Sequence, residues 1–97
     1  MMEQEKLNII IVDDNATFRK AIKKYLEVEF QYNIIADVSG GNDFFALPNI
    51  SQADVILMDL QMPEMDGYAI TKKHLINHHH IPVVAITMHT EKPTFRY

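Results

Sequence analysis

Four short apolar segments, rich in β-branched residues, alternate along this chain with stretches whose apolar residues have the period of a helix. The segments span residues 7–12, 34–38, 54–58 and 82–86. Their apolar residues are consecutive rather than alternating with polar ones, which is typical of strands buried on both faces. A parallel sheet with helices on both sides suits this pattern, so the sequence predicts an α/β fold with the order βαβαβαβ.

Three helices are expected between these strands. The first follows Asn15, a residue type suited to an N-cap, and carries apolar residues at helical spacing, namely Phe18, Ala21, Ile22, Tyr25 and Leu26. The basic side chains of the same helix are interpreted as its solvated face: Arg19, Lys20, Lys23 and Lys24. A short helix is expected at 42–47. The third helix, at 66–76, is expected to place four residues in the core: Tyr68, Ala69, Leu75 and Ile76.

The composition is that of one soluble globular domain. The chain has 97 residues, of which 47% are hydrophobic and 23% charged, and this excludes a disordered or low-complexity protein. No stretch approaches the roughly 20 apolar residues of a membrane span, and no secretory signal is recognised. The absence of cysteine excludes thiolate metal sites and fits a cytoplasmic location. With a net charge of −4, direct nucleic-acid binding by this segment is not expected.

Polar residues follow three of the predicted strands at the point where each strand ends. Asp13 and Asp14 follow the first strand, Asp59 the third and Thr87 the fourth. The carboxyl ends of parallel strands meet at one edge of the sheet, where α/β proteins bind ligands. Each aspartate alone could be a turn former or a helix cap. Three converging carboxylates repel one another unless a cation lies between them, so the pattern favours Mg²⁺.

Three segments resemble the receiver domain of bacterial two-component response regulators. They are residues 9–15 (IIIVDDN), 55–67 (VILMDLQMPEMDG) and 82–87 (PVVAIT). The resemblance covers residues 7–87, and the block at 59–67 is its most specific part. It implies a flavodoxin-like, doubly wound parallel sheet with the strand order 2-1-3-4-5. The residues at 87–89 further resemble the branch whose receivers are followed by a helix-turn-helix output domain.

The resemblance also implies a role for individual residues. Asp59 matches the phosphoacceptor, which takes a phosphoryl group from a sensor histidine kinase or a phosphotransfer protein. The implied Mg²⁺ site consists of Asp13, Asp14, Asp59 and the backbone carbonyl of Gln61. Thr87 matches the hydroxyl that bonds the phosphoryl oxygens. The implied chemistry is limited to the domain's own phosphorylation and dephosphorylation, so an enzyme acting on other substrates is not expected.

One element of the family pattern is not matched. The family has a lysine at the end of a fifth strand, but Lys92 lies only five residues beyond Thr87, too few for a helix and another strand. Lys92 is therefore interpreted as part of the loop or helix after the fourth strand. The expectation is a single receiver domain at 1–97 that lacks most of helix four, strand five and helix five. The outer edge of the fourth strand would be unpaired, which favours self-association through that edge.

Two alternative functions remain open from the sequence. A haloacid-dehalogenase-like phosphatase also uses a strand-end aspartate and Mg²⁺, but it needs a second carboxylate two residues later, where this chain has Gln61. A degenerate receiver that acts as a dimerisation module without phosphorylation is supported only by the unmatched lysine. The three histidines at 78–80 are interpreted as a solvated loop rather than a metal patch, because adjacent loop residues cannot all face one ion.

Overall fold

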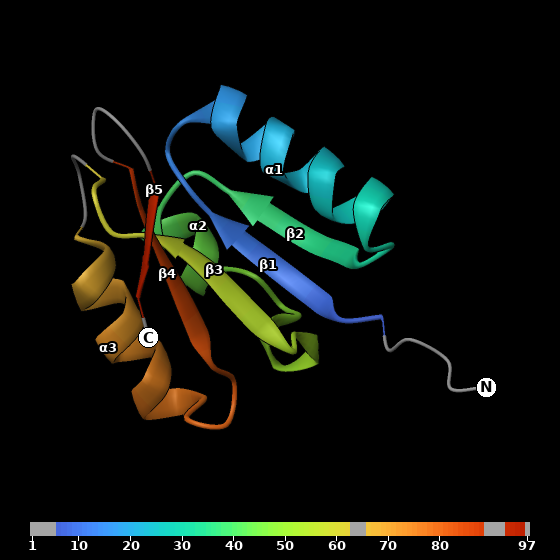
Figure 1. The fold of residues 1–97 in the computed structure, drawn as a ribbon. Helices are drawn as coiled ribbons and strands as arrows, with labels where there is room; N and C mark the ends of the chain where they lie inside the picture. The colour runs from blue at the N-terminus through green and yellow to red at the C-terminus, as the bar shows by residue number, and fades with distance from the viewer. Residues whose placement is uncertain (1–5, 63–65, 89–92, 97) are drawn as a thin grey trace.

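The computed structural model describes residues 6–62, 66–88 and 93–96. A five-stranded sheet with the order β2-β1-β3-β4-β5 forms its centre (Figure 1). The first four strands are parallel to their neighbours, and β5 is antiparallel to β4. The strands are β1 Asn8–Val12, β2 Asn33–Val38, β3 Val55–Asp59, β4 Val83–Met88 and β5 Pro93–Arg96. The predicted α/β fold and the order 2-1-3-4 of the parallel strands are confirmed.

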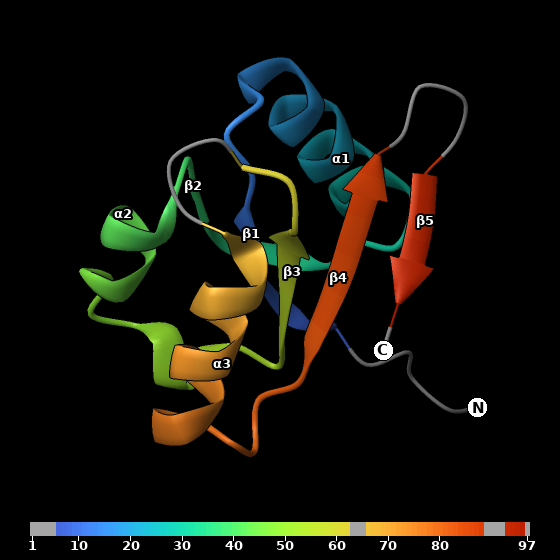
Figure 2. The same cartoon turned by 90° about the vertical axis from the view of Figure 1, so that its left-hand side faces the viewer.

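Helices cover both faces of the sheet. They are α1 Ala16–Glu29, α2 Gly41–Phe45 and α3 Gly67–Asn77, and a 3-10 turn, Ile50–Gln52, precedes β3. Helix α1 lies on one face, whereas α2 and α3 lie on the other (Figures 1 and 2). The main core fills the space between the sheet and α2 and α3, where the side chains of Ile10, Ile56, Phe44 and Ile70 pack together. Among the described residues, no helix combines the length and apolar character that a membrane span requires.

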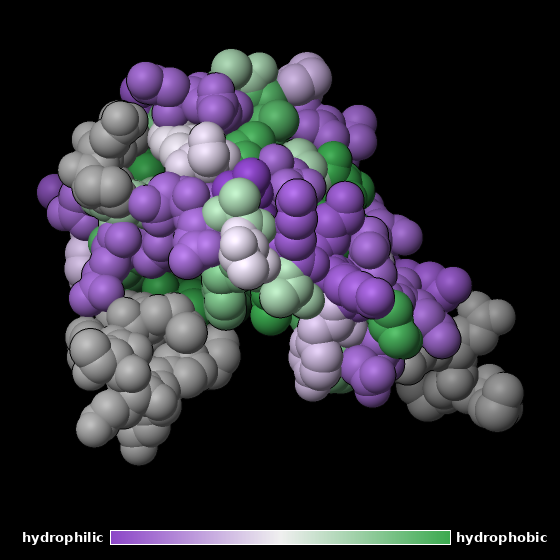
Figure 3. All heavy atoms as spheres, turned by 90° about the horizontal axis from the view of Figure 1, so that it is seen from above, coloured by the Kyte–Doolittle hydropathy of each residue, from purple (hydrophilic) through white to green (hydrophobic). Residues whose placement is uncertain are grey.

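The face under α1 is covered less completely. Ile9 and Ile11 point away from the main core, because successive strand residues face opposite sides, and both are buried beneath this helix. In α1 itself no residue is fully buried, and Tyr25 and Val28 are 53% and 59% exposed. Figure 3, which looks down on α1, shows a mainly hydrophilic surface with hydrophobic side chains scattered across it. Helix α1 is thus held by a half-buried stripe rather than by a deep core contact.

The expectation of an unpaired edge at β4 is wrong. Strand β5 pairs along this edge, with Ala85 opposite Arg96 and Met88 opposite Pro93. The prediction considered only a parallel fifth strand, whose crossover needs a dozen or more residues, whereas an antiparallel neighbour needs only a short hairpin. Lys92 lies outside the described residues, so its assignment to a loop or helix stays a prediction.

The expected core face of α3 is also wrong. Tyr68, Leu75 and Ile76 are 48%, 37% and 75% exposed. The helix buries another face, which consists of Gly67, Ile70, Thr71 and His74. These four residues recur at i, i+3, i+4 and i+7, so helical spacing rather than the apolarity of single residues selects the face that packs on the sheet. Burial lowers the pKa of His74, and its neutral ring donates from Nε2 to the Ile81 carbonyl oxygen at 3.1 Å.

Candidate functional site

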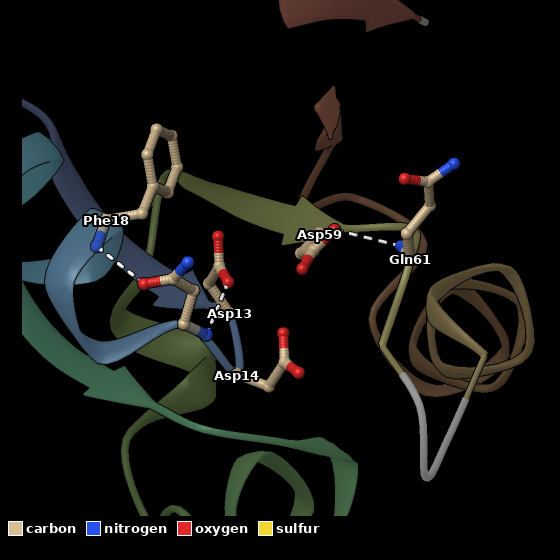
Figure 4. A pocket seen from close by; sticks show the side chains of 6 residues that line it. Asp13, Asp14, Phe18, Asp59 and Gln61 are labelled. Carbon is tan, nitrogen blue, oxygen red and sulfur yellow. Dashed lines mark hydrogen bonds between the residues drawn. The ribbon is translucent and has the colours of Figure 1, made fainter. Parts of the chain in front are cut away.

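A pocket of about 240 Å³ lies at the carboxyl ends of β1 and β3. Six residues line it: Asp13, Asp14, Asn15, Phe18, Asp59 and Gln61. Figure 4 shows the three carboxylates facing a common space from the ends of these two strands. Ligand oxygens of Asp13, Asp14 and Asp59 lie within 4.8 Å of one another. The structure thus brings together the carboxylates that the sequence singled out.

Two hydrogen bonds and a helix cap shape the first part of the pocket. The Asp13 N–H donates to the Val38 carbonyl oxygen at 3.0 Å, which ties the end of β1 to β2. The Asn15 N–H donates to Asp13 Oδ1 at 2.8 Å, and Asn15 Oδ1 accepts from the Phe18 N–H at 3.0 Å (Figure 4). Asn15 is therefore the predicted N-cap of α1. This turn buries the Asp13 side chain, which is 5% exposed, and leaves Asp14 exposed.

The second part of the pocket is the end of β3. Asp59 is the last residue of the strand, and its Oδ1 accepts the Gln61 N–H at 2.9 Å (Figure 4). Asp59 pairs with Ile86 of β4, and the Leu60 N–H donates to the Ile86 carbonyl oxygen at 3.2 Å. Thr87 follows Ile86 in β4, so its backbone lies one residue beyond the partner of Asp59.

Asp13 and Asp59 hold protons more tightly than free aspartates do. Burial raises the pKa of Asp13 from 3.8 to about 6, and the negative charge of Asp59 adds to this effect. Burial likewise raises the pKa of Asp59, although the N–H of Gln61 partly offsets it. Among the described residues, Arg19 and Lys23 both form their ion pairs with Asp37. Neither side chain therefore neutralises the carboxylate cluster, which consists of Asp13, Asp14 and Asp59. Desolvated, unneutralised carboxylates fit a hard divalent cation such as Mg²⁺.

Comparison with known families matches residues 9–96 to the response regulator receiver domain. The chain belongs to this family. Among curated relatives, the transcriptional regulatory protein DegU of Brevibacillus brevis is 29% identical over 94% of this receiver domain. The transcriptional regulatory protein YdfI of Bacillus subtilis is 35% identical over 86% of it. The receiver domain spans only 39% and 38% of the lengths of these two relatives.

Solved structures show the same fold. One of them is a two-component response regulator of the LuxR family from Aurantimonas sp.. The alignment covers 89% of this receiver domain and 61% of the Aurantimonas chain. The TM-score is 0.79 and the sequence identity is 22%, so the likeness concerns the fold alone. It agrees with the parallel sheet and flanking helices described above.

Four contacts near the pocket of the receiver domain were not predicted. Arg19 and Lys23, interpreted as solvated, both pair with Asp37 of β2, at 3.1 and 3.7 Å. The Arg19 Nη1 also donates to the Asp13 carbonyl oxygen at 2.6 Å. The signal in the sequence was Asp37 itself, a carboxylate next to the carboxyl end of a predicted strand. Gly67 belongs to the block at 59–67, but its contact was not predicted: α3 begins at this residue, directly against the end of β3.

We expect Asp13→Asn to stabilise the metal-free receiver domain at neutral pH. The pKa of Asp13 is higher in the folded state than in the unfolded state, so the folded state binds more protons between pH 3.8 and about 6. The stability that this carboxyl contributes is present below pH 3.8 and is lost as the pH rises through about 6. This pKa difference lowers the free energy of unfolding at pH 8 by at most about 3 kcal/mol, and Asp13→Asn should recover part of it. The asparagine carbonyl can still accept the Asn15 N–H.

The measurement is the melting temperature in EDTA at pH 5 and pH 8. The increase caused by Asp13→Asn should be larger at pH 8, and Glu27→Gln, an exposed change on α1, serves as the control. A variant that melts below the wild type at pH 8 would show that Asp13 is not under electrostatic strain.

Proposed function

We propose that this receiver domain is a phosphoacceptor of a two-component phosphorelay. In this proposal a phosphoryl group passes to Asp59, in the presence of Mg²⁺, from a sensor histidine kinase or a phosphotransfer protein. The phosphorylated domain then switches an output domain or a partner. The observation that carries the proposal is the group of three carboxylates within 4.8 Å of one another, at the strand ends of a chain in this family.

The hydrogen bonds around Asp59 support a role as nucleophile. The Gln61 N–H holds Oδ1, which leaves the other carboxylate oxygen of Asp59 to attack the phosphorus. As the new P–O bond forms, the bond from phosphorus to the donor breaks, and the donor leaves with the electron pair. The product is an acyl phosphate on Asp59. The Thr87 hydroxyl is proposed to bond the phosphoryl oxygens, because its backbone follows the β4 residue paired with Asp59.

The carboxylate cluster supports the proposed magnesium site. Asp13, Asp14, Asp59 and the Gln61 backbone carbonyl are the groups proposed to hold the ion, and carboxylate and carbonyl oxygens are ligands that Mg²⁺ prefers. Bound Mg²⁺ would supply positive charge for the oxygens of the transferred phosphoryl group. Asp13 and Asp59 gain from such a charge as well, since burial raises the pKa of both.

The wider biological role is part of the same proposal. DegU and YdfI are transcriptional regulatory proteins, which supports a helix-turn-helix output domain and a cytoplasmic location. A net charge of −4 supports the view that residues 1–97 do not themselves bind nucleic acid. Residues 1–97 are proposed to be one receiver domain without most of the family's fourth helix, parallel fifth strand and fifth helix. Self-association is retained as a proposal, because no residue of α1 is fully buried against the sheet. It would not use the edge of β4, since β5 pairs there.

Acetyl phosphate provides the direct test. The protein is incubated with acetyl phosphate and MgCl₂, and its intact mass is followed over time. An adduct of one phosphoryl group supports the proposal. Steady release of phosphate without an adduct would instead indicate a phosphatase, and neither an adduct nor turnover would indicate a degenerate receiver that serves for dimerisation.

We expect MgCl₂ to raise the melting temperature of the wild type and Asp14→Ala to remove this increase. An ion that binds only the folded state stabilises it by mass action, by about 1–2 kcal/mol at ten times the dissociation constant. Affinity in the sub-millimolar to millimolar range is expected, because Mg²⁺ dehydrates reluctantly. Melting curves from 0 to 20 mM MgCl₂, at roughly constant ionic strength, measure this effect.

The matched control is Asp43→Ala, which removes an exposed carboxylate of α2 outside the cluster. This variant should keep the increase. An increase that survives Asp14→Ala would place the ion elsewhere on the molecule.

A further inference from the structure

Arg19 links three parts of the fold behind the acidic pocket. It belongs to the first turns of α1, and its side chain is 17% exposed. Its Nη1 donates to the Asp13 carbonyl oxygen at 2.6 Å, and its Nε donates to Asp37 Oδ1 of β2 at 3.1 Å. The planar guanidinium group can make both bonds at once because its donors point in fixed, divergent directions. Arg19 does not line the pocket itself.

The contact fixes the peptide group that joins Asp13 to Asp14. The Asp13 N–H is bonded to the Val38 carbonyl oxygen of β2, and the Asp13 carbonyl is bonded to Arg19. Both backbone groups of Asp13 are therefore held, one by the sheet and one by the helix. The carboxylates of Asp13 and Asp59 each accept a backbone N–H, but among the described residues no backbone N–H is bonded to the Asp14 carboxylate. The direction of Asp14 consequently depends on the peptide group that Arg19 holds.

The positive charge of Arg19 is paired with a carboxylate outside the pocket. Its ion pair is with Asp37, and the Lys23 ammonium lies 3.7 Å from the other oxygen of the same carboxylate. The contribution of Arg19 to the pocket is therefore its hydrogen bond to the backbone rather than its charge.

We propose that Arg19 is a positioning residue for the acidic pocket, which sets the affinity for Mg²⁺ by holding the Asp13–Asp14 peptide group between α1 and β2. This inference rests on the proposed function, since it assumes that the pocket binds Mg²⁺. Asp37 belongs to the same arrangement, because it fixes the guanidinium group from the side of β2.

The two readings of Arg19 predict opposite results for Arg19→Met. Removal of a positive charge near three carboxylates should tighten Mg²⁺ binding if the charge matters. Loss of a positioning bond should weaken it, and residues that orient metal ligands typically change affinity by about tenfold or more. Arg19→Lys keeps the charge but cannot reproduce the two divergent bonds. We expect both variants to bind Mg²⁺ about tenfold more weakly than the wild type.

Lys23→Gln is the matched control, because it removes a charge that pairs with the same Asp37 and leaves the Arg19 bonds in place. The measurement is calorimetric titration of each full chain with MgCl₂, at a temperature at which melting curves in EDTA show it to be folded. Lys23→Gln should bind like the wild type to within about twofold, as expected for a partly exposed ion pair.

Several outcomes would overturn the inference. The first is that Arg19→Met binds Mg²⁺ as tightly as the wild type or more tightly, or that Arg19→Lys keeps the full affinity. Either result would show that Arg19 does not set the affinity by holding the Asp13–Asp14 peptide group. An equal loss of affinity in Lys23→Gln would assign the effect to the ion pairs with Asp37 rather than to the bond between Arg19 and the Asp13 carbonyl. If Arg19→Met does not fold, Arg19→Lys carries the test. A wild-type protein that takes up no Mg²⁺ would overturn the proposed function and this inference with it, whereas unaltered variants of a Mg²⁺-binding wild type overturn the inference alone.

Discussion

Asp59→Asn is expected to abolish the phosphoryl adduct formed from acetyl phosphate. A carboxamide has the shape of the carboxylate and can still accept the Gln61 N–H through its oxygen, but it is not a nucleophile at neutral pH. The pocket and the fold are therefore preserved while the reacting atom is lost. Because removal of one carboxylate also relieves the repulsion that the charge of Asp59 exerts on Asp13, the variant should be no less stable than the wild type. The intact mass after incubation with acetyl phosphate and MgCl₂ measures the result.

The matched control lies at the opposite end of the same strand. Asp54 directly precedes β3, is exposed, and accepts the Asn8 N–H at 2.7 Å, a bond that an asparagine can also accept. Asp54→Asn should form the adduct at the wild-type rate. An undiminished adduct on Asp59→Asn would assign phosphorylation to another residue and would refute the proposed role of Asp59.

The order of the elements and the position of the pocket could be predicted because both depend on local properties of the sequence. Consecutive apolar residues identify parallel strands, and parallel strands bring their carboxyl ends to one edge. The convergence of Asp13, Asp14 and Asp59 follows from these two facts, and the cap at Asn15 follows from its side chain. The resemblance to receiver domains is confirmed by the family match, and the chemical roles proposed for these residues come from it, because spacing alone does not give them.

Features that depend on packing between distant segments could not be predicted in the same way. The apolar residues of α3 were assigned to the core, yet Ile76 is 75% exposed while His74 is 1% exposed. Periodicity shows that a helix has a buried face, but the shape of the sheet beneath decides which residues occupy it. Strand β5 was excluded because the prediction assumed a parallel partner for β4, and the short segment before β5 permits only the antiparallel one.

Gly67→Ala is expected to have the largest structural effect at the pocket. Gly67 is the first residue of α3, and Asp66 caps this helix by accepting the Tyr68 N–H at 2.9 Å. A Cβ atom on Gly67 would overlap the Asp59 carbonyl oxygen and would lie 2.7 Å from Leu60 Cα. The backbone dihedral φ of Gly67 is not positive, so alanine can adopt the conformation and the obstacle is contact alone.

Gly67→Ala is expected to lower the stability of the fold, whereas helix propensity alone would predict an increase. Alanine in a helix is ordinarily favoured over glycine by about 1 kcal/mol. Here both colliding partners are backbone atoms of the strand end, which cannot rotate away as a side chain can. Either α3 or the end of β3 must move, at a cost of about 1–3 kcal/mol or more. A displacement of about 1 Å at a reacting group can slow a reaction about 100-fold, so adduct formation on Asp59 should slow by a similar factor.

Gly40→Ala is the matched control, because it makes the same change of residue type at a position where the new Cβ meets no other atom. Gly40 has open space around its would-be Cβ, and its φ of −176° is extended backbone that alanine adopts without strain. This control should melt close to the wild type and form the adduct at the wild-type rate, whereas Gly67→Ala should lose both stability and rate. If Gly67→Ala melted with the wild type and reacted as fast, the close approach of α3 to the end of β3 would not constrain the position of Asp59. The same pair of variants therefore tests whether the start of α3 fixes the phosphoacceptor.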